Sequence, residues 1–460
     1  MPYLFNKYYP LRNVAFFFGE GLLIFATLML VNWVFKGTAI FMLDLPECLQ
    51  QVVLVTVVFQ TCLYFFDLYE LRENLPLPAT ATRTTQAFGV GCIVLGIFYY
   101  ALPTVTIPTM IFWTSYFILY LFVLLWRAVY IFILQRKMFI QNVAIVGTGQ
   151  LAEEISRELE ERLDAPYYIC AFVGEENPQY NPGKAPVYRS LEEIHHKIMG
   201  HKIDQVVVAL DDRRGKTPIK ELLAYKLQGI SIENGINFYE KLTAKILAKK
   251  IDPSWIVFSA GFSISKVQLF GKRFFDVLLS LCLLVISFPV MLAASVIVKL
   301  ESPGPVFYKQ ERVGQGRRPF NVIKFRSMVK DAEKNGAVWA TANDSRVTRF
   351  GSFIRKVRID ELPQLFNVLR GEMSLVGPRP ERPVFVEKLK ESIPFYDIRH
   401  DVRPGVTGWA QVCYPYGASE EDALRKLEYD LYYLKHMSLP LDLYIIFRTI
   451  KTVLFAKGGR

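Results

Sequence analysis

The sequence predicts a membrane protein in three parts: a bundle of four transmembrane helices, a central α/β domain of the doubly wound, Rossmann-like type, and a mostly α-helical C-terminal part with a re-entrant membrane helix. Three observations predict this order. Uncharged apolar segments fill the first third, a glycine-rich turn between a strand and a helix follows, and an interrupted apolar segment opens a basic final part. We place the parts at residues 1–138, 139–265 and 266–460. A composition of 52% hydrophobic and 21% charged residues agrees with a membrane protein that has large water-soluble parts.

The first part holds four apolar segments that are each long enough to span a bilayer with some tilt. They are Val14–Phe35, Leu49–Phe66, Ala87–Ala101 and Ile111–Leu134. The basic residues that lie around alternate connections are Lys7, Arg12, Arg72, Arg83, Arg127, Arg136 and Lys137. Because basic connections favour the cytoplasm, both ends of the bundle are expected there. Glu20 lies inside the first segment, where an acid is often functional, but it is near one end, so we expect its carboxylate to reach the membrane interface.

The central part carries the pattern of a parallel sheet. Strands are predicted at Asn142–Val146, Tyr168–Val173 and Gln205–Ala209. Gly147 and Gly149 begin a G-x-G-x-x-A turn between the first strand and a helix that runs to Leu163, so they are candidate nucleotide-binding residues. Glu175 and Glu176 follow the second strand and could hold a ribose. A scaffold or dimerisation domain without a ligand is the alternative.

The third part opens with 22 uncharged residues, Val277–Val298. Pro289 lies at the middle of this segment, two residues after Ser287, and a proline there removes a helical hydrogen bond. Basic residues flank both ends of the segment, which favours the cytoplasmic side for both. An ordinary kinked span is the alternative. We predict a re-entrant helix over residues 275–299, because a full span would separate two parts that are both expected in the cytoplasm.

The net charge of +11 belongs entirely to the third part. Residues 1–265 hold 23 basic and 23 acidic residues, and residues 266–460 hold 31 and 20. Anionic lipid or a phosphorylated substrate could explain this excess. No nucleic-acid-binding motif is present, so nucleic acid is not an expected partner. The six cysteines are scattered without a CxxC motif, which excludes a disulfide framework or a cysteine metal site.

An acidic pair follows the densest group of basic residues. The pair is Asp360 and Glu361, and the basic residues before it are Arg312, Arg317, Arg318, Lys324, Arg326, Arg346, Arg349, Arg355, Lys356 and Arg358. Arginine and lysine bind phosphates, and a carboxylate can ligate a divalent metal or attack phosphorus. An acidic pair alone is more typical of a solvated helix start. Its context therefore decides its meaning.

That context resembles a known family. The motifs are KRFFDVLLS, SPGPVFYKQERVG, KFRSMVKDAE, VTRFGSFIRKVRIDELPQLFNVLRGEMSLVGPRPE and RPGVTGWAQV. Together they resemble the bacterial sugar transferases, the monotopic phosphoglycosyl transferases, from Lys272 to about Ala456. In architecture the whole chain resembles the larger polyprenyl-phosphate hexose-1-phosphate transferases.

The resemblance implies a reaction and a set of site residues. A sugar-1-phosphate passes from a UDP-sugar to polyprenyl (undecaprenyl) phosphate, and UMP is released. Asp360 is implied as the nucleophile that carries the phosphosugar, and Glu361 as its partner in holding Mg²⁺ or polarising the site. The residues expected to hold phosphates are Lys324, Arg326, Arg358 and Arg379. The family breaks its re-entrant helix at an adjacent Ser-Pro pair, whereas here Phe288 separates Ser287 from Pro289.

The resemblance also implies a setting. The reaction would be the initiating step of exopolysaccharide, capsule or O-antigen synthesis. The catalytic part would lie on the cytoplasmic face of the bacterial inner membrane. Membrane lipids, a second copy of the chain and polysaccharide assembly proteins are the expected partners, and glucose or galactose phosphate is the expected cargo. The final segment, Leu439–Gly458, is expected to be an interfacial helix or a core helix.

Two other function classes stay open. A membrane-anchored nucleotide-sugar dehydratase or epimerase could share the first two parts, but it needs a Y-x-x-x-K helix. The match in the central part, Tyr180–Lys184, contains Pro182 and Gly183 and is expected to be a loop. A non-catalytic scaffold for polysaccharide assembly is the second alternative, and the intact DELPQ motif disfavours it.

Overall fold

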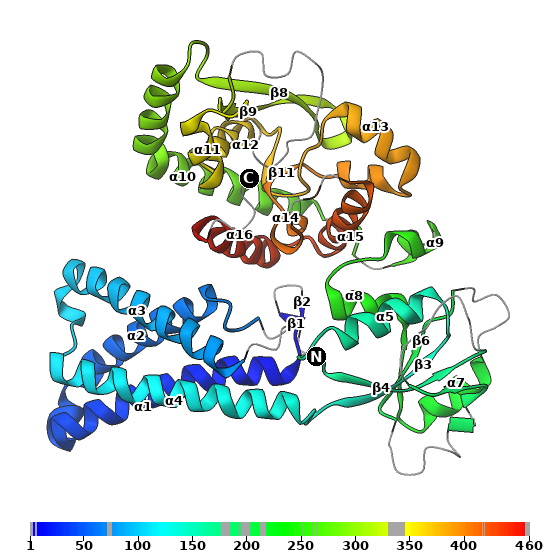
Figure 1. Cartoon of the computed structure of the whole chain (residues 1–460), viewed down its shortest axis with the longest axis horizontal. Coiled ribbons are helices and arrows are strands. Elements are labelled where there is room, and N and C mark those ends of the chain that lie inside the picture. The colour runs from blue at the N-terminus through cyan, green and yellow to red at the C-terminus, as the bar shows by residue number, and fades with distance from the viewer. Residues whose placement is uncertain are drawn as a thin grey trace. The chain divides into compact units, whose positions relative to one another are not determined.

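A computed structural model describes the chain in two compact units (Figure 1). Apart from the first seven residues, the units are Tyr8–Gly235 and Ile236–Arg460. The described residues are 3–4, 7–70, 76–175, 185–191, 193–194, 203–211, 218–251, 253–259, 261–263, 265–329, 346–415, 417 and 419–455. Arg72, Glu176 and the Tyr180–Lys184 motif lie outside them. Two short strands, β1 (Tyr3–Leu4) and β2 (Lys7–Tyr8), precede the first helix.

Long apolar helices form the start of the first unit, which confirms that the chain begins with several such segments. They are α1 (Leu11–Leu43), α2 (Leu45–Phe65), α3 (Leu77–Ala101) and α4 (Thr109–Gln135), with a 3-10 turn, η1 (Pro103–Val105), before α4. Ile24, Phe59 and Phe88 are among the side chains packed between them, while large apolar side chains such as Leu22 and Ile93 point outward. Outward apolar side chains on these helices suit a lipid environment. Five described helices are long and apolar enough to cross a membrane, these four and α10.

The sequence suggested that Glu20 reaches the membrane interface. In the structure its side chain is instead fully buried between helices. Arg127 on α4, expected at a cytoplasmic connection, is buried with it, and its Nη2 lies 2.7 Å from Glu20 Oε2. The hydroxyl of Tyr69 donates to the same carboxylate, and Arg127 Nη1 donates to Leu68 O at 2.8 Å. A charge inside an apolar bundle is stabilised only when it is paired, so each of these two residues keeps the other buried.

The central part is the predicted parallel α/β domain. Its described strands stand in the order β5-β4-β3-β6-β7, and all neighbouring pairs are parallel. The elements are β3 (Gln141–Val146), α5 (Gln150–Glu160), β4 (Tyr167–Val173), β5 (Val187–Tyr188), β6 (Gln205–Val208), α7 (Ile219–Leu227) and β7 (Ser231–Asn234). The strand order reverses at β3, so the carboxyl ends of β3 and β6 form the switch point where such folds bind ligands.

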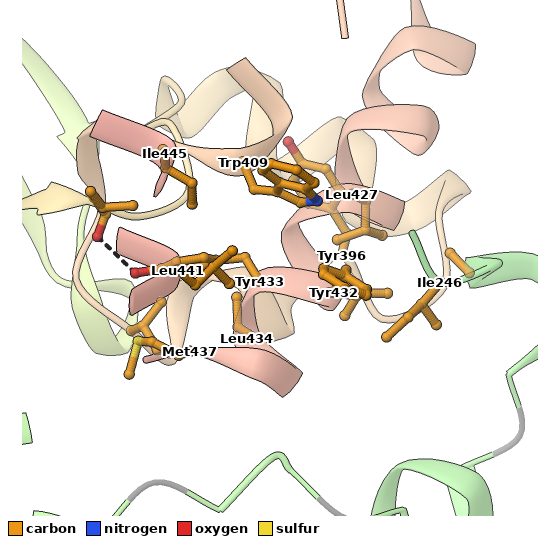
Figure 2. Close-up of a cluster of buried hydrophobic side chains, with 14 of the residues drawn as sticks. Ile246, Tyr396, Trp409, Leu427, Tyr432, Tyr433, Leu434, Met437, Leu441 and Ile445 are labelled. Atoms are coloured by element: carbon orange, nitrogen blue, oxygen red, sulfur yellow. Dashed lines mark hydrogen bonds between the residues drawn. The ribbon is translucent and has the colours of Figure 1, made fainter. Parts of the chain in front are cut away.

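The second unit begins earlier than the predicted boundary after residue 265. Its first elements are α8 (Gly235–Thr243), η2 (Ala248–Lys250) and α9 (Pro253–Phe258). Trp409 Nε1 donates to Ala244 O at 2.9 Å, and Glu240 pairs with Lys435 and His436 at 2.7 and 2.5 Å. In Figure 2, Ile246 lies in one cluster of buried side chains with residues such as Trp409 and Tyr432. The described residues from α8 to η2 therefore pack into the core of the C-terminal unit.

The apolar segment of the third part lies within α10 (Lys266–Glu301), a single helix of 36 residues that continues through Pro289. A capping box between Ser265 and Gln268 begins it. The helix is therefore not divided into two at Pro289, where the sequence predicted a break. The ribbon of α10 instead changes direction along its length in Figure 1, as expected where a proline removes one hydrogen bond and crowds the preceding turn. Ser287 Oγ lies 3.6 Å from Met291 Sδ.

The rest of the unit is mostly helical, with a β-hairpin near its start. The hairpin joins β8 (Phe307–Val313), η3 (Gln315–Arg317) and β9 (Pro319–Phe325) in antiparallel pairing, and β10 (Ser374–Val376) pairs in parallel with β11 (Gly405–Thr407). The remaining elements are α11 (Arg349–Lys356), η4 (Ile359–Glu361), α12 (Gln364–Arg370), α13 (Pro383–Ser392), η5 (Tyr396–His400), α14 (Trp409–Cys413), α15 (Glu420–His436) and α16 (Leu439–Leu454).

The last helix packs one face into the core, and its interfacial role stays a prediction. Leu441 and Ile445 of α16 are fully buried in the core shown in Figure 2. Leu443, Ile450 and Leu454 of the same helix are exposed. One face of α16 thus packs on the unit, and the other presents an apolar surface.

Candidate active site

The acidic pair is buried, unlike the solvated helix start that an isolated pair suggests. Asp360 and Glu361 lie in η4 with exposed fractions of 7% and 8%. Arg358, just before them, has a left-handed backbone with φ of 60°, and its carbonyl accepts from Glu361 N at 3.3 Å. This turn separates α11 from η4 and directs both carboxylates into the unit.

Three cations converge on one oxygen of Glu361. Lys324 Nζ lies 2.9 Å from Oε1, Arg379 Nη2 lies 3.3 Å away and Arg358 Nη1 lies 3.6 Å away. The structure therefore gathers three of the four predicted phosphate-binding residues from β9, from the loop after β10 and from the turn before η4. Burial by itself would raise the pKa of Glu361, but Lys324, Arg379 and Arg358 outweigh it and lower this pKa. Glu361 is consequently an ionised counter-charge at neutral pH.

Asp360 has the opposite character. Burial, followed by repulsion from Glu361, raises its pKa to about 6, against an opposing effect of Lys324 and the arginines nearby. Its Oδ1 is buried and has no hydrogen-bond partner among the described residues. A buried carboxylate oxygen without a partner is costly, and such groups are frequent at sites that bind ligands. Two adjacent acids with divergent pKa values suit two different chemical roles.

The hairpin and α12 fix the position of Lys324. Asn367 of α12 is fully buried, and its amide nitrogen donates to Asn321 O at 2.8 Å while Ile323 N donates to its Oδ1 at 3.0 Å. Burial lowers the pKa of Lys324, and Glu361 counteracts this effect. Asn367 was missed from sequence, although it lies in the same motif as the acidic pair.

A second buried network holds the loop that carries Arg379. Arg399 Nη2 donates to Arg379 O at 3.0 Å and lies 2.8 Å from Asp430 Oδ2, and Arg399 Nη1 donates to the Tyr396 hydroxyl at 2.8 Å. Burial raises the pKa of Asp430 to about 6, with Arg399 opposing it. Neither Arg399 nor Asp430 stood out in the sequence, because they lie 31 residues apart along the chain.

The start of α10 supports the strand before that loop. Lys272 Nζ donates to Val376 O at 3.0 Å and to Asp442 Oδ2 at 2.7 Å. Tyr433 donates from its hydroxyl to Asp442 at 2.8 Å, and Asp276 Oδ1 accepts from Leu375 N at 3.1 Å. Lys272 and Asp276, which precede the apolar segment, therefore anchor β10.

Arg326 does not join the cluster around Glu361. Its guanidinium donates to Ser302 O at 2.6 Å, Pro303 O at 3.1 Å and Val298 O at 3.3 Å, which places it at the carboxyl end of α10. Val298 is among the last four residues of α10, whose carbonyl groups lack a partner within the helix, and Ser302 and Pro303 directly follow the helix. Arg326 thus has a visible structural role, in contrast to the phosphate-binding role expected from its motif. Ser287 and Pro289 lie within α10 and take no part in the cluster described above.

Gly147 and Gly149 belong to the other unit. They form the turn between β3 and α5, as predicted, but the amides of Gln150 and Leu151 that follow donate to the carboxylate of Asp211, at 2.8 and 3.3 Å. A phosphate would need these amides.

The protein ligands available for the expected Mg²⁺ are the two carboxylates of the acidic pair. Among the described residues there is no group of three or more His, Cys, Asp or Glu side chains placed to hold a metal. Magnesium commonly uses one or two carboxylates together with substrate phosphates and water. The free oxygen of Asp360 next to Glu361 fits that mode, so the residues present are compatible with an ion that binds with a diphosphate.

Two family models match separate parts of the chain. A model described as bacterial sugar transferase matches residues 267–456, which include the whole cluster around Glu361. A model described as CoA-binding domain matches residues 64–225, which include the parallel sheet up to α7.

Several characterised proteins are similar to this chain. A UDP-N-acetylgalactosamine-undecaprenyl-phosphate N-acetylgalactosaminephosphotransferase from Aeromonas hydrophila is 52% identical over 43% of this chain and 46% of its own. An undecaprenyl-phosphate glucose phosphotransferase from Komagataeibacter xylinus is 34% identical over 69% of this chain and 60% of its own. The match thus spans less than two thirds of either relative. The exopolysaccharide production protein PSS of Rhizobium leguminosarum bv. phaseoli is 40% identical over 41% of this chain and 97% of its own. The chain belongs to the bacterial sugar transferase family.

Proposed function

We propose that this protein transfers a sugar-1-phosphate from a UDP-sugar to polyprenyl phosphate and releases UMP, through a phosphosugar bound covalently to Asp360. The observation that carries the proposal is the contrast within the acidic pair. Glu361 is neutralised by three cations, whereas Asp360 has a buried oxygen with no partner among the described residues. The names of the relatives support the same general reaction.

In the first half of the reaction, one bond to phosphorus forms and one breaks. A carboxylate oxygen of Asp360 attacks the sugar-side phosphorus of the UDP-sugar, and the bond from this phosphorus to the bridging oxygen breaks. UMP leaves with the electron pair on that oxygen, and an acyl phosphate remains on Asp360. Lys324, Arg358 and Arg379 stabilise the charge on the diphosphate, since cations aimed at a transferring phosphoryl group lower its barrier.

The second half returns the enzyme to its starting state. An oxygen of polyprenyl phosphate attacks the same phosphorus, and Asp360 leaves as a carboxylate. The product is a polyprenyl-diphosphate sugar. Asp360 and Glu361 would hold Mg²⁺, which neutralises phosphate charge when bound. Glu361 also keeps the three cations in place between the two half-reactions.

We also propose the setting that the sequence suggested. The apolar helices anchor the chain in the bacterial inner membrane as a multi-pass protein with four N-terminal spans, and α10 enters and leaves the bilayer on the cytoplasmic side. This topology would bring a lipid phosphate and a soluble nucleotide sugar to one site. Membrane lipids, a second copy of the chain and polysaccharide assembly proteins are the proposed partners, and initiation of an exopolysaccharide, capsule or O-antigen is the proposed role.

Nucleotide release tests the reaction directly. Membranes with the full chain are given polyprenyl phosphate with UDP-glucose, UDP-galactose or UDP-N-acetylgalactosamine, and the released nucleotide is identified. UMP together with a lipid-linked diphosphate sugar is the expected result. Release of UDP would mean transfer of the sugar alone and would refute the mechanism. An altered nucleotide sugar with no lipid product would favour a dehydratase or epimerase, and no turnover with any of them would favour a scaffold.

A further inference from the structure

We infer that the glycine-rich loop of the α/β domain is closed by the chain's own Asp211 and does not bind the phosphate of a nucleotide or of CoA. The fold and the family description both imply such a ligand at this loop. The side chains and backbone around the loop do not fit one. The Asp211 carboxylate takes the place that the phosphate would need.

The carboxylate occupies the groups that would bind an anion. Asp211 Oδ2 accepts from Gln150 N at 2.8 Å, and Oδ1 accepts from Leu151 N at 3.3 Å. These are the first two amides of α5, a helix of 11 residues, and the first amides of a helix have no partner within it. Phosphates bind in these folds by accepting from such amides. Here an internal anion already satisfies them.

Contacts within the chain itself account for both glycines. Gly147 has a φ of +129°, and a Cβ there would lie 2.4 Å from Ala209 O. A Cβ on Gly149 would lie 2.1 Å from Asp211 Oδ2. In a dinucleotide site, glycines allow the ligand to approach the backbone. In this domain they allow the loop after β6 to approach, so the motif is explained without a ligand.

The neighbouring loop is drawn over the same turn. Thr148 Oγ1 donates to Glu175 O at 2.6 Å, in the loop that follows β4. The segments after β3, β4 and β6 therefore contact one another at the switch point, where a bound dinucleotide would lie across the sheet. A ligand phosphate would meet the negative charge of Asp211 and would have to displace it. The domain thus carries the fold of a nucleotide-binding domain with its anion site filled.

The experiment measures binding and amide exchange on the full chain in lipid nanodiscs. The probes are CoA, NADH, ADP and inorganic phosphate at millimolar concentrations, read by equilibrium dialysis. Hydrogen exchange at Gln150 and Leu151 is followed in parallel. In the natural chain we expect no saturable binding at this domain and no effect of any probe on those amides. In Asp211→Ala we expect exchange at both amides to rise about fivefold, as for loss of a helix cap, and inorganic phosphate to reverse part of the rise.

Asp204→Ala is the matched control. Its carboxylate accepts from Asn142 N at 2.9 Å, at the other end of β3, so exchange at Gln150 and Leu151 should not change. If Asp211→Ala does not fold, Asp211→Asn keeps the shape, and the binding measurement on the natural chain decides independently. Saturable binding of CoA, NADH or ADP that protects residues 147–152 in the natural chain would overturn the inference. Unchanged exchange at Gln150 and Leu151 in a folded Asp211→Ala protein would overturn it equally. Neither result depends on UMP release.

Discussion

The glycine-rich loop and the acidic pair both suggested phosphate binding from sequence. They differ in whether the chain itself satisfies the polar groups that would contact a phosphate or a metal. At the loop, an anion from the chain satisfies the amides of Gln150 and Leu151. At the acidic pair, three cations surround Glu361, and Asp360 Oδ1 is left without a partner among the described residues. A binding site is thus distinguished from a structural motif by the polar groups that the fold leaves unsatisfied.

The sharpest test of this contrast is Asp360→Asn. An amide cannot act as the nucleophile, so we expect transfer to fall by at least roughly a thousandfold and the covalent adduct to disappear. Intact mass after incubation with UDP-sugar alone measures the adduct. The control is Glu387→Gln, which removes a carboxylate that is 64% exposed on α13. An adduct that persists in Asp360→Asn would assign the nucleophile to another residue.

The second test removes the counter-charge. In Glu361→Gln, the three cations lose their shared carboxylate, and we expect transfer to fall by roughly a hundredfold. Because Glu361 is one cause of the raised pKa of Asp360, this pKa should move down in the variant. The residual adduct formation, followed by quenched-flow across pH, should therefore persist to lower pH than in the natural chain. A midpoint that moves up would contradict the assigned coupling.

The pH profile of the natural chain tests the state of Asp360. The nucleophile is the ionised carboxylate, and its pKa is raised to about 6. The rate of adduct formation in single turnover should accordingly increase as pH rises through about 6 and reach a plateau above it. Asp430 also has a pKa raised to about 6, so the profile is repeated in Asp430→Asn. If the midpoint disappears only in that variant, Asp430 and not Asp360 controls the profile.

Two arginines from neighbouring motifs should separate binding from stability. For Arg379→Gln we expect kcat/KM for the UDP-sugar to fall by roughly tenfold or more, because a cation of the cluster is lost. For Arg326→Gln we expect a loss of stability of about 2 kcal/mol, because the carbonyl groups of Ser302 and Pro303, directly after α10, lose their donor. Thermal unfolding and steady-state kinetics of both variants measure this. A raised KM for the UDP-sugar in Arg326→Gln, with unchanged thermal stability, would instead support a phosphate-binding role for Arg326.

The smallest effect is expected at the loop. Asp211→Asn should leave the rate of UMP release within about twofold of the natural chain, because Asp211 belongs to the first compact unit and the acidic pair to the second. The assay is the nucleotide-release measurement, run with and without added CoA. A CoA-dependent change in the natural chain that Asp211→Asn removes would show that the loop regulates transfer.

Much of the fold could be predicted because its signals are local. Strand and helix patterns predicted β3, α5, β4 and β6 to within a few residues, and apolar length predicted the N-terminal helices. The failures arose where partners lie far apart along the chain. Glu20 was expected at an interface because Arg127, 107 residues away, could not be known as its partner. Ala244 lies in the segment 236–265 that we placed in the central part, and it contacts Trp409, 165 residues further along the chain.

The sequence by itself determined the family, the apolar helices, the parallel sheet and the residues of the acidic pair, since each depends on local pattern or motif. Only the tertiary structure decided which charges meet. It brought Lys324, Arg358 and Arg379 to Glu361, sent Arg326 to the end of α10 and closed the glycine-rich loop with Asp211. The physical reason is that electrostatic roles depend on distances of a few ångströms between side chains from different elements, which no local pattern contains.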